Sequence, residues 1–129
     1  MSKLIYLDTN IWLDYIQERK GKYLDLQDFA CRILNRTLSC EFNILVSDIV
    51  LFELRKVCST TFLHDFKKKL VFCRTQECHK QLARSIDIHY PDNVHVAIAI
   101  TQNCAMIVSN DLEMQSLHVS IPIISSQDL

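Results

Sequence analysis

Apolar residues along this chain form two kinds of pattern. Short continuous apolar runs, typical of buried strands, occur at 3–7, 43–46, 105–109 and 121–125. Longer segments in which apolar residues recur every three or four positions, typical of amphipathic helices, occur at 11–19, 24–38, 49–57, 92–103 and 111–117. Ser47 stands where a side chain caps the third of these helices. Strands and helices therefore alternate along the chain.

This alternation predicts the fold class. Strands separated by helices indicate an α/β domain with a parallel sheet, right-handed crossovers and helices on both faces. Residues 60–88 have a helical and basic pattern, which we interpret as two helices, although 69–73 also fits an extended strand. No linker, repeat or break in composition divides the chain, so we expect residues 1–129 to form a single domain.

Composition narrows the class of protein. The chain has 129 residues, of which 49% are hydrophobic and 22% charged, as is typical of a globular domain. Its single glycine excludes the loops of P-loop NTPases and dinucleotide-binding enzymes, because those loops need several glycines. Asp8 interrupts the opening apolar run, and no run approaches ~18 residues. We therefore expect a soluble cytoplasmic protein without a membrane span.

The cysteines and histidines show no spacing typical of a metal site. The six cysteines include no CxxC pair, so we interpret them as buried reduced thiols. Cys73, Cys78 and His79 form the one cluster, but structural zinc sites use tighter, paired spacings. The remaining histidines are interpreted as packing or surface residues: His64, His89, His95 and His118.

Charge is distributed unevenly although the net charge is −1. All 14 lysine and arginine residues lie at or before Arg84, which gives that part a charge of +4. Residues 85–129 contain five acids and no basic residue. The acids could belong to a solvated face, or some of them could converge on a cation that supplies the missing positive charge.

Four acids are placed where parallel strands end. Asp8 directly follows the first strand, and Asp111 follows the strand at 105–109 by two residues. Glu53 lies on the second turn of the helix after the second strand, and Asp92 opens a helix. Because the reactive crevice of such sheets lies at the carboxyl ends of the strands, we expect these side chains to converge. Clustered carboxylates favour a hard cation such as Mg²⁺ or Mn²⁺ and, with it, phosphodiester hydrolysis.

Three segments together resemble the motifs of PIN-domain ribonucleases, particularly the small toxins of VapBC-type toxin–antitoxin pairs. They are LIYLDTNIWLDYI, ILVSDIVLFELRKV and PDNVHVAIAITQNCAMIVSND. Each segment alone is a weak signal, but their order and spacing are specific. The resemblance covers nearly the whole chain and is poorest over 60–90. It implies a three-layer α/β/α sandwich around a mainly parallel sheet of four to five strands.

The resemblance also implies roles for individual residues. Asp8, Glu53, Asp92 and Asp111 would bind Mg²⁺ or Mn²⁺ and carry catalysis. Three further residues would orient ligands or water: Asn10, Ser109 and Glu113. Each acid also has a structural interpretation, since aspartates at helix starts act as caps or interact favourably with the helix dipole. The implied function is a metal-dependent endoribonuclease that is the toxin of a toxin–antitoxin pair.

Two other functions stay open on the same motifs. One is an RNA-processing or quality-control nuclease, and the other is a non-catalytic module that binds RNA or protein. A set of basic residues could hold the RNA backbone or form a solvated helix face: Lys67, Lys68, Lys69, Arg74, Lys80 and Arg84. Apolar residues of the first helices could belong to the core or to a groove for an antitoxin or a second protomer: Trp12, Tyr15, Ile16 and Tyr23. The resemblance implies an RNA substrate, an antitoxin partner and a homodimer.

Overall fold

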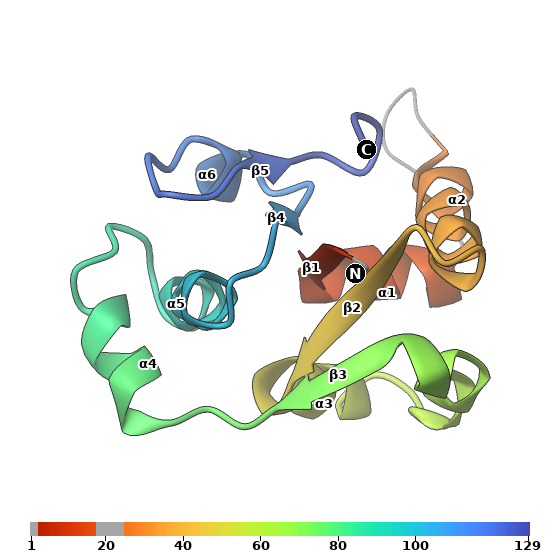
Figure 1. The fold of residues 1–129 in the computed structure, drawn as a ribbon, viewed down its shortest axis with the longest axis horizontal. Coiled ribbons are helices and arrows are strands. Elements are labelled where there is room, and N and C mark those ends of the chain that lie inside the picture. The colour runs from red at the N-terminus through yellow and green to blue at the C-terminus, as the bar shows by residue number, and fades with distance from the viewer. Residues whose placement is uncertain (1–2, 18–24) are drawn as a thin grey trace.

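The centre of the molecule is a sheet of five parallel strands in the order β3-β2-β1-β4-β5 (Figure 1). A computed structural model describes residues 3–17 and 25–129. The strands are β1 (Lys3–Leu7), β2 (Phe42–Ser47), β3 (Leu70–Cys73), β4 (Met106–Val108) and β5 (Ile123–Ile124). Each neighbouring pair is parallel. The expected mainly parallel sheet is confirmed, and every pairing in it is parallel.

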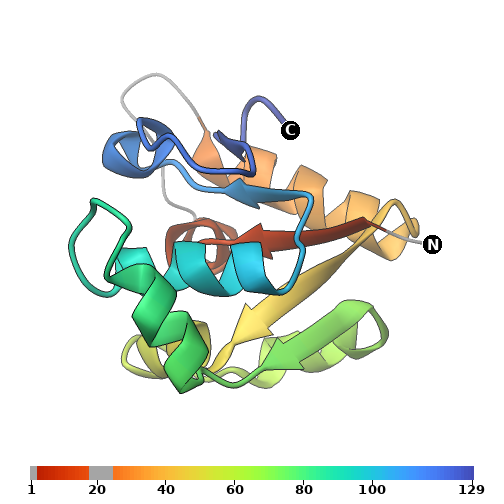
Figure 2. The ribbon, with the colours of Figure 1, turned by 60° about the vertical axis from the view of Figure 1, so that its left-hand side comes forward.

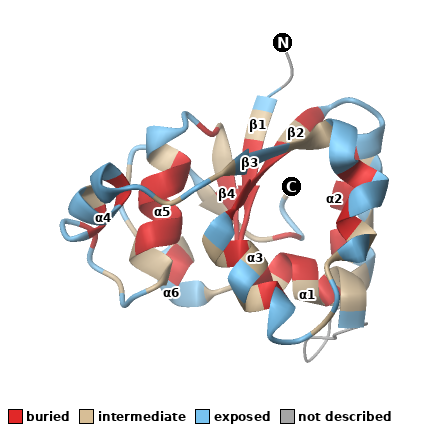
Figure 3. Ribbon diagram, turned by 90° about the horizontal axis from the view of Figure 1, so that it is seen from below, coloured by how far each residue is buried: buried red, intermediate tan, exposed pale blue. Residues whose placement is uncertain are grey.

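Helices cover both faces of this sheet. The α-helices are α1 (Thr9–Gln17), α2 (Leu26–Leu38), α3 (Asp48–Arg55), α4 (Glu77–Ala83), α5 (Asp92–Thr101) and α6 (Leu112–Gln115). Figure 3 shows α1 and α2 on one side of the strands and α4 and α5 on the other, while α3 packs against α1. The three-layer α/β/α sandwich is therefore confirmed. None of the described helices is long and apolar enough to cross a membrane.

The sequence pattern explains the most buried elements. Residues 5–7 of β1 and 44–46 of β2 are fully buried, as expected for strands covered on both faces. Helix α5 is buried almost all round, from Val94 to Ala99. Ser47 caps α3 as predicted, because its Oγ accepts a hydrogen bond of 3.2 Å from the backbone N–H of Val50.

Residues 60–88 differ from the two-helix prediction. A 3₁₀-helix, η1 (Thr61–Lys69), leads into β3, and only the last part of the segment forms an α-helix, α4. Strand β3 pairs with β2 along 70–73 and lies at the edge of the sheet. Its Val71 and Phe72 side chains are exposed, so its pattern lacks the burial that marks the central strands. Pairing with β2 therefore explains the extended conformation of β3, and the alternative prediction of a strand at 69–73 is confirmed.

Two helices end without glycine. After α2, Cys40 adopts a positive φ of 67°, and after α5, Asn103 adopts a φ of 58°. In both turns two backbone N–H groups bond back to the last carbonyls of the helix, which is the Schellman pattern. Cys40 is exposed, as is Cys78, so the expectation that all cysteines are buried is wrong for these two. Cys40 thus lies at the surface in the turn that ends α2.

The structure shows where several apolar residues of the first helices lie, which were predicted to belong either to the core or to a groove for a partner. Trp12 is fully buried in the core. Tyr15 and Ile16 are partly buried and pack against that core. Tyr23 lies outside the described residues, as do the ends of the predicted helices at 18–19 and 24. The described part of α1 therefore contributes mainly to the core.

Candidate active site

The order in which strands are added to the sheet reverses between β1 and β4. From β1 the sheet extends to β2 and β3 on one side, and β4 and β5 follow on the other. Figure 2 shows the arrowheads of the strands pointing to the same side of the molecule. The crevice outside the carboxyl ends of strands at such a point is where α/β sheets bind ligands. Asp8 follows β1 and Ser109 follows β4 at this place.

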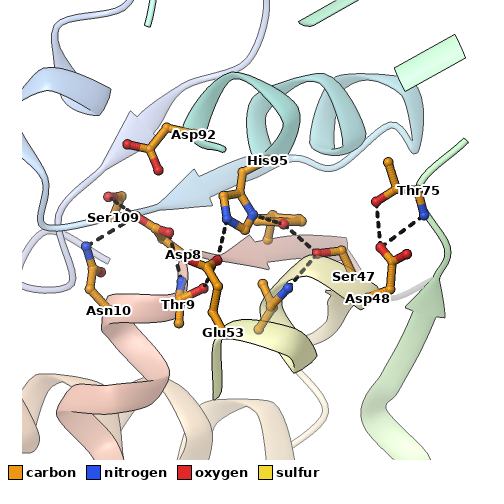
Figure 4. A network of polar contacts seen from close by, with 12 residues as sticks. Asp8, Thr9, Asn10, Ser47, Asp48, Glu53, Thr75, Asp92, His95 and Ser109 are labelled. Carbon is orange, nitrogen blue, oxygen red and sulfur yellow. Dashed lines mark hydrogen bonds and ion pairs between the residues drawn. The ribbon is translucent and has the colours of Figure 1, made fainter. Parts of the chain in front are cut away.

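Asp8 is 6% exposed and its carboxylate is held by three donors (Figure 4). Its Oδ1 accepts from the backbone N–H of Thr9 at 2.8 Å. Its Oδ2 accepts from Ser109 Oγ at 2.7 Å and from Asn10 Nδ2 at 3.2 Å. Burial raises the pKa of Asp8, although the hydrogen bonds from Ser109 and from the backbone N–H of Thr9 oppose that rise. The supporting contacts expected for Asn10 and Ser109 are present.

Glu53 reaches the same place from α3. Its Oε1 accepts from Thr9 Oγ1 at 2.8 Å and lies 2.8 Å from His95 Nε2. Partial burial acts to raise the pKa of Glu53, but its hydrogen bonds with His95 and with the Thr9 hydroxyl lower it below its usual value. Glu53 is therefore ionised at neutral pH.

Asp92 opens α5 and its side chain is 16% exposed. Burial raises the pKa of Asp92, and the nearby charges of Asp8 and Asp111 raise it further. His89 lies between two of the acids, with its Nε2 3.0 Å from Asp92 and its Nδ1 3.3 Å from Glu113. Glu113 is thus brought to the rim of the site through His89.

Asp111 begins α6 as its cap. Its Oδ1 accepts from the backbone N–H of Glu113 at 2.9 Å, and its own N–H donates to Ser109 Oγ at 3.1 Å. Its charge also acts on Asp92, as noted above. Asp111 therefore makes the capping contact of the structural interpretation while lying close enough to influence a second acid. We call Asp8, Glu53, Asp92 and Asp111 the acidic edge.

One group of side chains in the described part of the chain could hold a metal ion. It contains Asp8, Asp92 and His95, whose ligand atoms lie within 4.8 Å of one another. Both ring nitrogens of His95 already contact protein groups, Nδ1 the Tyr6 hydroxyl and Nε2 Glu53. The aspartate oxygens are then the remaining donors, and oxygen donors suit Mg²⁺ or Mn²⁺ rather than Zn²⁺. Cys73, Cys78 and His79 form no such group among the described residues.

Sequence reasoning missed several members of this site. His95 was expected to be a packing or surface residue, yet it is fully buried and contacts Glu53. Thr9 was not among the predicted site residues, yet its hydroxyl donates a hydrogen bond to Glu53. His89 was expected to be a packing or surface residue, and it is exposed but contacts Asp92. The spacing of His95 three residues after Asp92, on one face of a helix, was the signal that could have found it.

Comparison with known proteins bears on the fold. No protein-family profile matches the chain, and no curated protein matches its sequence. Among solved structures, one similar chain belongs to VapBC2 from Rickettsia felis, in a complex with a DNA fragment from its promoter. That chain is 19% identical in sequence to this one, with a TM-score of 0.65. The match covers 95% of this chain and 98% of that one.

Two further structures are similar. A chain of a toxin–antitoxin complex from Klebsiella pneumoniae is 14% identical with a TM-score of 0.65, and the match covers 95% of this chain and 97% of that one. The PIN domain endonuclease Utp24 is 19% identical with a TM-score of 0.50, and the match covers 95% of this chain and 84% of that one. Similarity at this level of identity establishes a shared fold, so the resemblance inferred from the motifs is confirmed for the fold.

Proposed function

We propose that this chain is a metal-dependent endoribonuclease and the toxin of a toxin–antitoxin pair. The observation that carries the proposal is the convergence of Asp8 and Asp92 where the sheet reverses its strand order. Glu53 is held beside them by Thr9 and His95, and the charge of Asp111 acts on Asp92. The four acids come from segments as far apart in sequence as Asp8 and Asp111, and like charges at such short range oppose folding unless a cation is bound. Their assembly is therefore better explained by function than by stability.

The donor set fits a hard divalent cation. Asp8 and Asp92 would hold Mg²⁺ or Mn²⁺ directly, and Glu53 and Asp111 would extend the negative charge around it. Such an ion polarises a phosphodiester and lowers the pKa of a bound water. Burial, with a further contribution from neighbouring acids, raises the pKa values of Asp8 and Asp92, and raised pKa values of this kind are common at functional sites.

The side chains around the ion would have distinct tasks. Both hydrogen bonds of Glu53 end on Oε1, so its Oε2 can accept a hydrogen bond from the attacking water. Ser109 and Asn10 hold the Asp8 carboxylate, and the capping bond of Asp111 holds that residue at the start of α6. These contacts would fix the acids before substrate arrives, which is the usual source of catalytic efficiency in such sites.

The toxin assignment follows the two matches with the higher TM-scores. Both matched structures are toxin–antitoxin assemblies, and each match covers 97% or more of the matched chain. The match to the PIN domain endonuclease Utp24 has the lower TM-score of 0.50. On this basis we propose an antitoxin partner. The RNA substrate, homodimeric state and cytoplasmic location expected from the sequence are part of the same proposal. An RNA-processing nuclease is the second possibility, and the acidic edge disfavours a non-catalytic module.

The test is cleavage of a pool of total RNA and tRNA by the purified protein. Cleavage is expected with Mg²⁺ or Mn²⁺ and is abolished by EDTA and by Asp8→Asn, which also controls for contaminating nucleases. The matched control is Asp128→Asn, an exposed acid near the end of the chain, which should leave cleavage intact.

Two results together contradict the proposal. The RNA pool stays uncut under every condition, and Mn²⁺ titration shows no binding by the wild type that Asp92→Asn weakens. Cleavage that persists in Asp8→Asn with undiminished metal dependence contradicts the assignment of the site. Co-expression of the open reading frame adjacent to the gene tests the toxin assignment. An antitoxin is expected to copurify with this chain and to suppress its cleavage.

A further inference from the structure

A chain of buried polar groups leads from the core to the acidic edge. Ser47 Oγ lies 2.9 Å from the Tyr6 hydroxyl, which contacts His95 Nδ1. His95 Nε2 lies 2.8 Å from Glu53 Oε1 (Figure 4). Ser47, Tyr6 and His95 are fully buried, and they come from β2, β1 and α5. Three separate elements therefore meet in one line of polar contacts that ends on a proposed catalytic acid.

Each buried polar atom needs a hydrogen-bond partner, and this requirement determines which atom donates and which accepts at each contact of these buried groups. An ionised carboxylate only accepts, so the contact with Glu53 requires a hydrogen on His95 Nε2. In a neutral imidazole Nδ1 then accepts, and the Tyr6 hydroxyl is the donor that contacts it. Tyr6 can in turn accept from Ser47, whose oxygen takes the backbone N–H of Val50. In this arrangement each polar hydrogen makes one hydrogen bond, from Val50 to Ser47, Tyr6, His95 and Glu53 in turn.

Two other features support this order. Burial raises the pKa of Tyr6 well above its ordinary value, so its hydroxyl keeps the hydrogen that it donates. The rings of Tyr6 and His95 also pack edge to face, with centroids 5.6 Å apart, which limits rotation of the imidazole. Both the position of the ring and the position of its hydrogen are therefore fixed from the core side.

We propose that Tyr6 and His95 are positioning residues that hold Glu53: Tyr6 selects the Nε2-protonated tautomer of His95, and that nitrogen donates to Glu53 Oε1. The proposal rests on the proposed nuclease function for its catalytic consequence. With Oε1 occupied by His95 and Thr9, Glu53 presents its other oxygen to the attacking water. A protonated Nε2 cannot bind a metal, so His95 leaves the ion to the oxygen donors.

The first test observes the tautomer without metal or RNA. A long-range ¹H–¹⁵N NMR spectrum of the full chain at pH 7.5, with EDTA, distinguishes the two neutral tautomers and the doubly protonated ring. The His95 signals are assigned by their loss in His95→Gln. We expect the Nε2-protonated tautomer in the wild type and a mixture of tautomers in Tyr6→Phe. An Nδ1-protonated or doubly protonated ring in the wild type overturns the proposal.

The second test measures cleavage by variants with matched controls. We expect Tyr6→Phe to lower kcat about 10-fold with little change in KM, within the ~10–100-fold range for groups that orient metal-site residues. His95→Gln, whose amide can still donate to Glu53, should retain more activity than His95→Leu. Tyr15→Phe and His118→Gln make the same chemical changes outside this polar chain and should have no effect on kcat.

The results separate the two proposals. A wild type that neither cleaves RNA nor binds Mn²⁺ contradicts the nuclease proposal, whereas the NMR spectrum still decides the tautomer. Equal kcat in Tyr6→Phe and the wild type, with folded spectra for both, overturns the positioning role. Equal loss of activity in His95→Gln and His95→Leu does the same, because it shows that the donor to Glu53 does not matter.

Discussion

The two ends of the parallel sheet differ in chemistry. At the carboxyl ends of the strands, Asp8 and Glu53 are held by hydrogen bonds, and their pKa values are shifted. At the opposite end, the turns after α2 and α5 place Cys40 and Asn103 at the surface in left-handed conformations. Helices begin at the first end, so their free N–H groups and caps face the acids there. Chemistry is therefore concentrated where strands stop and helices start.

The same comparison divides the basic residues. Lys67, Lys68 and Lys69 precede β3, whereas Arg74 follows it and Arg84 lies just beyond α4. Figure 1 shows α4 beyond the arrowhead of β3, at the opposite end from the segment that enters the strand. Because the strands are parallel, the second group lies toward the acidic edge and the lysines lie away from it. The sequence suggested one basic strip, and the structure separates it into two groups.

Among changes that test the difference between the two ends, we expect the largest effect from removing one hydroxyl beside the acidic edge. Thr9→Val deletes the donor to Glu53 Oε1 while keeping a side chain of similar shape. We expect kcat for RNA cleavage to fall about 10-fold, since groups that orient metal-site residues are worth ~10–100-fold. The control is Thr101→Val in the last turn of α5, at the other end of the sheet, where the hydroxyl donates to the carbonyl of Ala97. Equal kcat values in the two variants would remove the distinction between the ends.

A smaller effect is expected from the basic residues. Replacing Arg74 and Arg84 by glutamine should raise KM several-fold and reduce the salt dependence of RNA binding by ~1–2 in logarithmic slope, because each phosphate contact releases about one counterion. The same change at Lys67 and Lys68 should affect KM less, because these residues lie at the far end of the sheet. Titrations of RNA binding at several salt concentrations measure both slopes. A larger change for the lysine pair would place the RNA at the opposite end.

The smallest effect concerns stability. The pKa of Asp92 is raised in the folded protein by burial and by neighbouring acids, so its favourable contribution is complete below the pKa of an unfolded aspartate and is lost as pH rises through the folded pKa. Asp92→Asn should therefore raise the metal-free Tm by roughly 2–4 °C at pH 7 and give no gain near pH 3.

Thermal melts from pH 3 to 8 in EDTA measure this difference. The matched control is Asp65→Asn, an exposed residue of η1, for which we expect no change in Tm at either pH. A Tm gain for Asp92→Asn that is independent of pH would show that the charge of Asp92 is not its cause. Added Mn²⁺ should reverse the gain, since the ion then stabilises the wild type alone.

Much of the fold could be predicted because its signals are local. The buried runs that became β1, β2 and β4 and the cap at Ser47 depend on neighbouring residues in the chain. Strand β3 could be recognised only as an alternative, since its conformation comes from pairing with β2 and two of its side chains, Val71 and Phe72, are exposed. The acids Asp8 and Asp92 were found because both stand at the ends of elements.

The contacts among these residues could not be predicted in the same way. Nothing near His95 in the sequence indicates that its ring lies between Tyr6 and Glu53, which are 89 and 42 residues away. Local sequence pattern determines which segments form strands and helices, because backbone conformation and burial follow from nearby side chains. Partners such as these are decided only when the sheet brings distant segments together, and the requirement to satisfy each buried polar atom then selects which side chains meet.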